Sequence, residues 1–307
     1  MITSSVRFDE ETTIFTQREL TRVRARVYER EYPMKKMANG EIIPISIQTD
    51  FEWDDYIEVE EYDVVGIAAV IADYSKGGPR VGNVVRRVFY KIKTVGDHAG
   101  WSWEEINKAR THNKPLREQR LRAAREAADN YLNQGGYDGD TDFGLPGIFT
   151  LPIPRFTSIR PFAQATSTDD LLAMLNASVR GMMIATNGMA MPRKLVLPQK
   201  QFGQIHDTYR ASGSDQSVAE AFLNTQSIQG LISQIICDDN LKGKGDNGTD
   251  AGLILPDDED KICLGVQMPF NMLPEQQINL EFVVHGVMRT SLVQCLYPME
   301  SLIIQGI

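Results

Sequence analysis

The sequence predicts an α+β chain, and three stretches carry that prediction. Apolar and β-branched residues alternate or cluster through residues 41–94, as is typical of strands. Within residues 115–133, apolar side chains recur three and four positions apart, which predicts one long amphipathic helix. From Ser167 to the end of the chain, helical and strand patterns alternate.

The composition is that of an ordinary globular protein. Its 307 residues are 42% hydrophobic and 24% charged, enough to bury one large core or two modest ones. The net charge of −9 argues against a dedicated nucleic-acid binder, which needs a basic surface. Neither the polar opening residues nor the longest apolar run fits a signal peptide or a membrane span. We expect a soluble intracellular protein whose three cysteines are reduced.

Residues 1–36 are basic and poor in large apolar side chains. Such a segment buries too little surface to order itself, so it is typical of an arm that a partner orders. A solvated helix docked on its own domain is the alternative. The basic residues are Arg18, Arg22, Arg24, Arg26, Arg30, Lys35 and Lys36.

Three strands are expected next. Residues 42–48 alternate, and Pro44 suits only an edge strand because proline cannot donate to a ladder. Residues 63–73 and 83–93 flank a turn marked by Gly77-Gly78-Pro79, which predicts an extended hairpin. A lone hairpin is marginal in water, so a protruding one needs another surface to lie on.

The long helix follows a short amphipathic segment at residues 101–110. Pro115 can open it, because a proline at the first helical position loses no hydrogen bond. One face is apolar and small, and the opposite face is charged. The charged face holds Arg117, Arg122, Arg125 and Asp129. We expect Gly135-Gly136 to end the helix, since glycine adopts the left-handed conformation cheaply.

The aspartates after the helix do not form a calcium loop. Asp138, Asp140 and Asp142 alternate as ligands would. Phenylalanine, however, stands at the sixth and twelfth loop positions, where glycine and glutamate are required. An ordinary loop is therefore expected.

The second half begins with Ser167, which is typical of a helix N-cap. Helices are expected at residues 171–187, 199–209 and 216–223, and a mobile polar loop at 238–249. Strands are expected at residues 193–198, 232–237, 261–267, 278–287, 291–297 and 302–306.

The sequence carries no pattern of an enzyme site. The four histidines are scattered, and no serine lies in a nucleophile-elbow motif. The glycine-rich stretch 243–249 lacks the spacing of a phosphate-binding loop, and no dinucleotide fingerprint is present. We expect no catalytic residue, no cofactor and no metal.

The order of arm, hairpin, long helix and mixed second half resembles the major capsid proteins of tailed bacteriophages, which share the Hong Kong 97-type capsid fold. Four stretches carry the resemblance: residues 101–110, the helix at 115–133, Phe143-Gly-Leu-Pro-Gly-Ile148, and residues 286–298. The fold that this implies has an N-terminal arm at 1–40, then a strand-rich segment at 41–100 with an extended loop at about 60–92. It continues with a peripheral domain at 101–190, which holds a spine helix at about 115–133, and an axial domain at 191–285. It ends with terminal strands at 286–307 that return to the peripheral domain.

The resemblance also implies a function. It implies a structural protein, not an enzyme, that self-assembles as hexamers and pentamers into the icosahedral shell around the double-stranded DNA of a tailed phage or prophage. It further implies assembly in the host bacterial cytoplasm, a portal, weak sequence-independent contact with DNA, and no contact with a membrane. Because no long domain precedes the arm, we expect a separate scaffolding protein or none.

Contacts between subunits follow from the same resemblance. Those of the extended loop are expected at Lys76, Arg80, Val85 and Phe89. Those of the arm and spine helix, with neighbours or with the inner surface, are expected at Arg18, Arg22, Arg24, Arg26, Arg117, Arg122 and Arg125. Covalent cross-linking through Lys76 is not predicted, because nothing in the sequence marks its partner.

Two alternatives remain at this point. The first is an encapsulin-type nanocompartment, a shell of the same fold that encloses a cargo enzyme. The second is a metal-dependent hydrolase that uses Asp138, Asp140 and Asp142.

Overall fold

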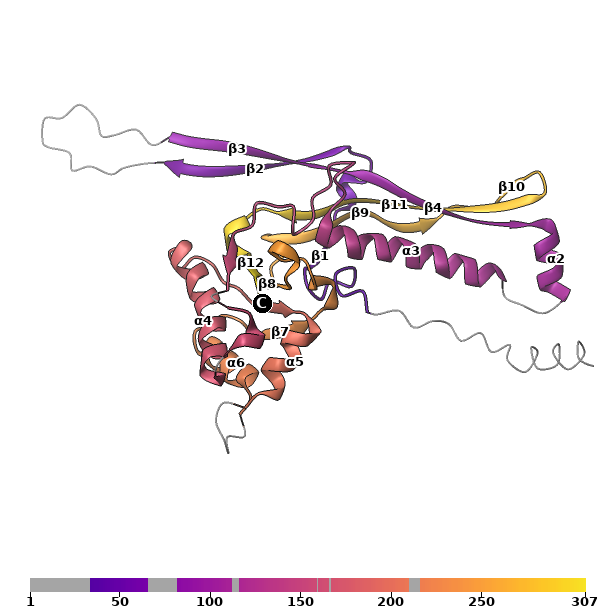
Figure 1. The fold of residues 1–307 in the computed structure, drawn as a ribbon. Helices are drawn as coiled ribbons and strands as arrows, with labels where there is room; N and C mark the ends of the chain where they lie inside the picture. Colours follow the sequence, from indigo (N-terminus) through magenta and orange to yellow (C-terminus); the bar gives the residue numbers. More distant parts are fainter. Residues whose placement is uncertain (1–33, 66–81, 112–115, 159, 166, 210–215) are drawn as a thin grey trace, which may run out of the picture. The chain divides into compact units, whose positions relative to one another are not determined.

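The computed structural model describes residues 34–65, 82–111, 116–158, 160–165, 167–209 and 216–307 (Figure 1). The chain divides into two units, Met1–Met34 and Lys35–Ile307, and every element named below belongs to the second. That unit combines helices and sheets in an α+β fold, as predicted. Residues 1–33 of the predicted arm and 66–81 of the predicted hairpin lie outside the described residues.

The first sheet is built around β11 (Glu281–Cys295), which pairs antiparallel with β4 (Lys93–Ser102) and with β9 (Ile262–Met272). β10 (Gln276–Ile278) extends it, and β1 (Ile45–Ile47) is an edge strand parallel to β9, as Pro44 indicated. β11 is one strand where the sequence predicts two. Residues 288–290, which seemed to separate them, are buried and stay in the ladder through register shifts.

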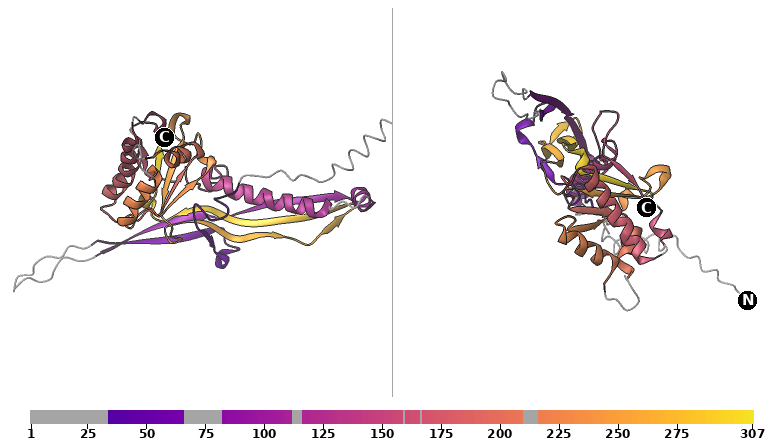
Figure 2. Two further views of the ribbon diagram at one scale, coloured as in Figure 1. Left: turned by 90° about the horizontal axis from the view of Figure 1, so that it is seen from below. Right: turned by 90° about the vertical axis from the view of Figure 1, so that its left-hand side faces the viewer.

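The predicted long helix is α3 (Leu116–Asp138), which lies along this sheet in Figure 1 and in the left view of Figure 2. α2 (Trp103–Thr111) follows β4 directly. The small face of α3 is buried at Ala124 and Ala128, and the helix packs on β4 and β11. Alanines let the helix axis approach the sheet closely. The apolar pattern predicted this face in part, because Ala123 and Ala127, which it also placed there, are exposed.

α3 does not end at Gly135-Gly136, which is a correction to the sequence prediction. Both glycines are buried inside the helix. A Cβ on Gly136 would lie 2.5 Å from Met37 Cγ, and one on Gly135 would lie 2.9 Å from Leu292 Cδ1. The two glycines therefore admit neighbouring side chains to the helix surface. The helix ends before Gly139, whose φ of 70° is the left-handed conformation.

The predicted hairpin is formed by β2 (Tyr56–Val65) and β3 (Gly82–Lys91). They pair antiparallel from Tyr56 with Lys91 to Val65 with Gly82. β3 matches the expected strand closely, whereas β2 begins earlier than expected and residues 66–73 lie outside the described part. At the base of the hairpin, Ile57, Tyr90 and Ile92 form a small buried cluster.

The second sheet has the order β5-β12-β8-β6-β7. Its strands are β5 (Arg155–Thr157), β6 (Lys194–Leu197), β7 (Gln234–Cys237), β8 (Ala251–Leu255) and β12 (Leu302–Gln305). Three helices pack on it: α4 (Thr168–Ala185), α5 (Gln199–Asp207) and α6 (Val218–Ile228). Ser167 caps α4 as predicted, because its side chain accepts a hydrogen bond from the amide of Asp170.

Three further details differ from the sequence prediction. Residues 238–249 are not a plain surface loop, because they form the 3₁₀ turns η3 (Asp239–Leu241) and η4 (Asp246–Gly248), and Leu241 is fully buried. The buried strand β8 was not predicted. The terminal segment 286–307 is divided, since β11 belongs to the first sheet but β12 pairs with β8 and β5 in the second.

Candidate assembly surfaces

The hairpin has one face packed on its own chain and one face in solvent. Directly opposite residues in an antiparallel pair share a face, so Ile57 and Tyr90 belong to the packed side. Tyr56 and Phe89 belong to the other side and are 56% and 59% exposed. On that side Arg87 forms exposed ion pairs with Glu58 and Glu60, each at 3.2 Å. The solvent side therefore presents aromatic rings beside an arginine that is already paired with two glutamates.

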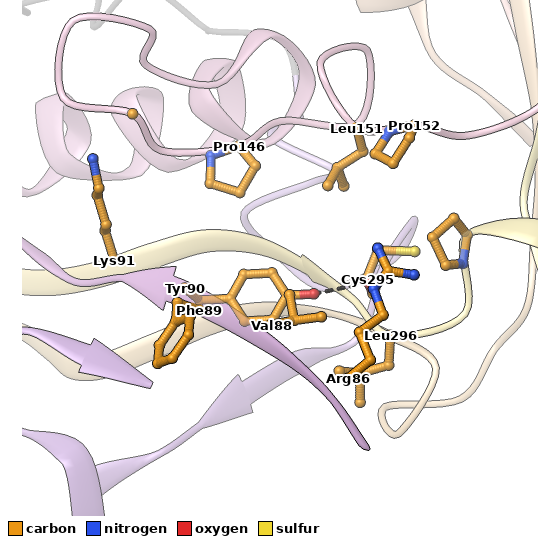
Figure 3. A pocket seen from close by; sticks show the side chains of 12 residues that line it. Arg86, Val88, Phe89, Tyr90, Lys91, Pro146, Leu151, Pro152, Cys295 and Leu296 are labelled. Atoms are coloured by element: carbon orange, nitrogen blue, oxygen red, sulfur yellow. Dashed lines mark hydrogen bonds between the residues drawn. The ribbon is translucent and has the colours of Figure 1, made fainter. Parts of the chain in front are cut away.

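Tyr90 fastens the packed face to the first sheet. Its hydroxyl donates a 2.8 Å hydrogen bond to the carbonyl of Cys295 (Figure 3). Burial, the largest cause, raises the pKa of Tyr90 from 10.0 to about 12. The phenol thus stays neutral in the folded protein over a range in which it ionises in the unfolded chain.

We predict that the unassembled protein loses stability as the pH rises from 10 to 12. In that window the unfolded chain ionises at Tyr90 and the folded chain does not, so the stabilisation present below pH 10 is lost. The loss from Tyr90 is roughly 2 kcal/mol after allowance for its partial solvation. Urea unfolding at pH 9, 10, 11 and 12 measures it. Tyr90→Phe should reduce the pH dependence by this amount and leave the part due to other buried groups such as Cys263 and Cys295. An unchanged slope would contradict the assignment; Tyr209→Phe, at an exposed tyrosine, is the control.

A groove of about 290 Å³ lies between β3 and the loop that follows α3 (Figure 3). Its walls are largely apolar, and two cationic side chains, Arg86 and Lys91, stand among them. The remaining lining residues are Val88, Phe89, Tyr90, Gly144, Pro146, Leu151, Pro152, Cys295, Leu296 and Pro298. The stretch Gly144-Leu-Pro-Gly147, on which the family resemblance partly rests, therefore supports the base of the hairpin.

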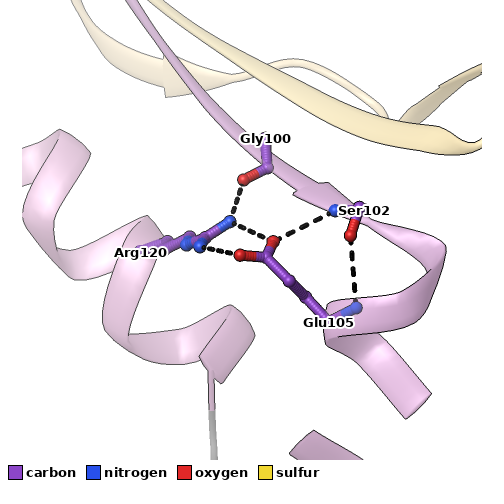
Figure 4. Close-up of polar contacts among 4 residues, drawn as sticks. All are labelled: Gly100, Ser102, Glu105 and Arg120. Carbon is purple, nitrogen blue, oxygen red and sulfur yellow. Dashed lines mark hydrogen bonds and ion pairs between the residues drawn. The ribbon is translucent and has the colours of Figure 1, made fainter. Parts of the chain in front are cut away.

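The corner between β4, α2 and α3 is locked by a polar cluster (Figure 4). Ser102 and Glu105 form a reciprocal capping box, in which each backbone amide donates to the other side chain. Arg120 on α3 donates to both carboxylate oxygens of Glu105 and to the carbonyl of Gly100. The hydrogen bond from Arg120 lowers the pKa of Glu105 below its usual value. This cluster fixes the direction of α3 relative to the end of β4.

A compact turn precedes the hairpin and carries exposed aromatic and acidic side chains together. We call residues 47–56 the acidic-aromatic turn. Trp53 is 79% exposed, although its ring lies 5.9 Å from the guanidinium carbon of the buried Arg289. Arg289 also donates to the carbonyls of Glu52 and Asp54. Sequence analysis missed this surface; the signal within it is the alternation of aromatic and acidic residues from Asp50 to Tyr56.

The structure places only part of the predicted contact set. Phe89 lies exposed on β3, and Arg122 and Arg125 lie exposed on the outer face of α3. Val85 and Arg117 belong to β3 and α3, but their side chains lie outside the described residues. The other predicted contacts also lie outside them: Arg18, Arg22, Arg24, Arg26, Lys76 and Arg80.

Among the described residues, the free cysteines are largely buried and two of the aspartates near the end of α3 are engaged within the chain. Burial raises the pKa of Cys263 to about 11 and that of Cys295 to about 12, so these free thiols stay protonated. Asp138 pairs with Lys244, and Asp140 accepts from the hydroxyl of Tyr131. Across the described ranges, no three His, Cys, Asp or Glu side chains are grouped to hold a metal ion. No described helix combines the length and apolar character that a bilayer crossing needs.

Comparison with known proteins identifies the fold. The capsid of Myoviridae phage XM1 matches with a TM-score of 0.81 at 14% identity, covering 94% of this chain and 98% of that one. A chain from Mycobacterium phage Ogopogo matches with a TM-score of 0.57 at 12% identity, covering 91% and 94%. The virus-like particle from Pyrococcus furiosus matches with a TM-score of 0.50 at 12% identity, covering 82% and 86%. Comparison with curated protein sequences finds no match.

These capsid chains share the α+β fold of this chain. The family model described as "Major capsid protein" matches residues 66–307. The chain belongs to that family, and its role is structural. The resemblance to tailed-phage major capsid proteins is thereby confirmed, and the nanocompartment alternative is not favoured.

Proposed function

We propose that copies of this chain assemble as hexamers and pentamers into an icosahedral shell around the double-stranded DNA of a tailed phage or prophage. The observation that carries this proposal is the hairpin, which exposes Tyr56 and Phe89 on the face that its own chain leaves uncovered. A shell supplies the missing cover, because heterologous contacts that close into rings place a neighbour against each subunit.

The domain roles of the Hong Kong 97-type fold fit the two sheets. The first sheet with α2 and α3 would be the peripheral domain, with α3 as the spine helix. The second sheet with α4, α5 and α6 would be the axial domain. This proposal moves β5 and α4 out of the predicted peripheral range 101–190, and β12 out of the terminal strands expected to return to that domain. The hairpin of β2 and β3 would be the extended loop. The arm would be residues 1–34, shorter than the predicted 1–40, because Lys35 and Lys36 donate to the carbonyls of Glu126 and Cys237 and Met37 is buried in the core of the second unit.

The proposed partners follow from charge. A net charge of −9 supports only weak, sequence-independent contact with packaged DNA, through local basic positions. Arg122 and Arg125 on the exposed face of α3 are candidates for this contact or for a subunit boundary, together with the arm arginines. A portal and a separate scaffolding protein complete the proposal. Assembly would take place in the host bacterial cytoplasm.

Electron microscopy of the expressed full-length chain, alone and with the scaffold gene of its own genome, tests the proposal. Closed shells of uniform size are the expected result. Protein that remains monomeric at high concentration under both conditions would contradict it. Neighbouring genes for terminase and portal are expected, and a neighbouring cargo enzyme would instead support a nanocompartment.

A further inference from the structure

The acidic-aromatic turn is an exposed surface for which the described part of the chain provides no cover. Four of its large apolar side chains are exposed: Ile47 62%, Phe51 39%, Trp53 79% and Tyr56 56%. Four carboxylates stand among them: Asp50, Glu52, Asp54 and Asp55. Exposed aromatic side chains gathered in this way mark protein contacts, and the surrounding carboxylates specify a basic partner.

The turn is held rigid from below by a buried arginine. Arg289 is 6% exposed and donates to the carbonyls of Glu52 and Asp54, while its guanidinium lies under the ring of Trp53. Backbone hydrogen bonds of η1 (Thr49–Phe51) and the bond from Ile92 to the carbonyl of Asp55 fix the remainder. A contact residue that is already ordered loses little freedom on binding. Trp53 is thus pre-organised as an anchor.

We propose that this turn binds the basic hairpin segment of a neighbouring copy, residues 74–85, and that Lys76 and Arg80 meet its carboxylates. The proposal rests on the shell function and names the partner surface of the extended loop. Residues 74–85 contain two cations, Lys76 and Arg80, and no carboxylate, whereas Arg87 already pairs with Glu58 and Glu60. The two surfaces are therefore complementary in charge.

The geometry of the hairpin shows why the partner must be another copy. The acidic-aromatic turn adjoins the pair of Tyr56 with Lys91, whereas residues 66–81 continue from the pair of Val65 with Gly82. Nine residue steps of paired strand separate these two ends, a distance of roughly 30 Å. The six residues from Gly82 back to Lys76 reach at most about 20 Å. Lys76 cannot fold back onto its own turn, so the contact is head-to-tail between copies.

Zero-length cross-linking tests the contact directly. A carbodiimide joins a lysine amine to a carboxylate only when the two are in contact. In shells of the full-length chain, Lys76 should be joined to Asp50, Glu52, Asp54 or Asp55, and mixed ¹⁴N and ¹⁵N subunits should show that the linked peptides come from different copies. Linkage of Lys76 to other carboxylates only, or within one copy only, would overturn the proposal.

Charge reversal supplies a second test with its own control. Asp50→Lys/Asp54→Lys and Lys76→Glu/Arg80→Glu should each lower shell yield at least tenfold, and the four changes combined should restore at least half of the yield. Asp258→Lys/Glu259→Lys reverses two exposed charges elsewhere and should leave the yield within twofold of the natural chain. Unchanged urea midpoints of the unassembled variants show that the effect lies in assembly.

The outcomes separate this proposal from the shell function. Shells formed by the natural chain and equally by Asp50→Lys/Asp54→Lys would overturn the contact and leave the shell function standing. Failure of the combined variant to recover would also overturn the contact. If the natural chain itself forms no shells, the proposed function fails first.

Discussion

Gly147→Ala should prevent the accumulation of folded protein. A Cβ at this position would lie 2.6 Å from the carbonyl oxygen of Tyr137 and 2.7 Å from the carbonyl carbon of Asp138, and would also overlap the amide nitrogen of Gly139. All three atoms belong to the backbone at the end of α3, so no side chain can rotate away. The cost should exceed about 3 kcal/mol, at the upper end of overpacking effects.

The backbone around Gly147 explains why relaxation is not cheap. The amides of Ile148 and Phe149 donate to the carbonyls of Gly136 and Tyr137 at 2.9 and 3.0 Å. Moving the loop to admit a methyl group would break these bonds and shift the apolar wall of the groove at the base of the hairpin. Soluble yield and the urea midpoint of the unassembled protein measure the loss.

Gly181→Ala is the matched control for this prediction. Gly181 lies within α4, and a Cβ there would meet Phe156 at 3.6 Å, an ordinary contact. Alanine should therefore stabilise the helix by about 0.5–1 kcal/mol. Similar stability changes in the two variants, or folded Gly147→Ala at normal yield, would show that the turn at 147 is not fixed as described.

The helices α3 and α4 show where prediction from sequence succeeds and where it stops. The periodic apolar face of α3 and the Ser167 cap of α4 depend on residues close in sequence, so both were predictable. Gly135 and Gly136 are ambiguous from sequence alone, because a glycine pair ends a helix as readily as it admits a neighbour. The side chains of Met37 and Leu292 occupy the space beside the two glycines, which shows that the pair admits neighbours and does not end the helix. Both residues lie far away in the sequence.

The acidic-aromatic turn carries a weak signal in the sequence, the alternation of aromatic and acidic residues, but that signal does not establish a surface, for a related reason. Its residues are polar and aromatic in a pattern that suits an ordinary loop. What makes it a surface for binding is Arg289, which approaches from β11 and fixes two of its carbonyls. Arg289 itself lies in the stretch that the sequence suggested was a break between strands, because a buried arginine needs partners that only the folded chain supplies.

Phe89→Lys should leave the subunit folded and stop shell formation. The side chain is 59% exposed on the solvent face of β3, so the free energy of unfolding should change by less than about 0.5 kcal/mol. Lysine is preferable to aspartate here because Glu58 lies directly opposite and would repel a second carboxylate. In a shell, the neighbour that covers Phe89 would meet a charged ammonium group in place of an aromatic ring, and removing that group from water should lower the yield at least tenfold.

Val88→Lys, at the adjacent position, should give the reverse pattern. Val88 is partly buried and packs against the cluster of Ile57, Tyr90 and Ile92, so a lysine there should destabilise the unassembled subunit by about 1–3 kcal/mol. Urea unfolding and shell yield measured on both variants separate the two faces of one strand. If Phe89→Lys loses stability as Val88→Lys does, Phe89 belongs to the subunit's own core; if it assembles normally, no neighbour covers it. A hairpin face that tolerates lysine in the free chain but not in the shell is one whose apolar side chains are used only between subunits.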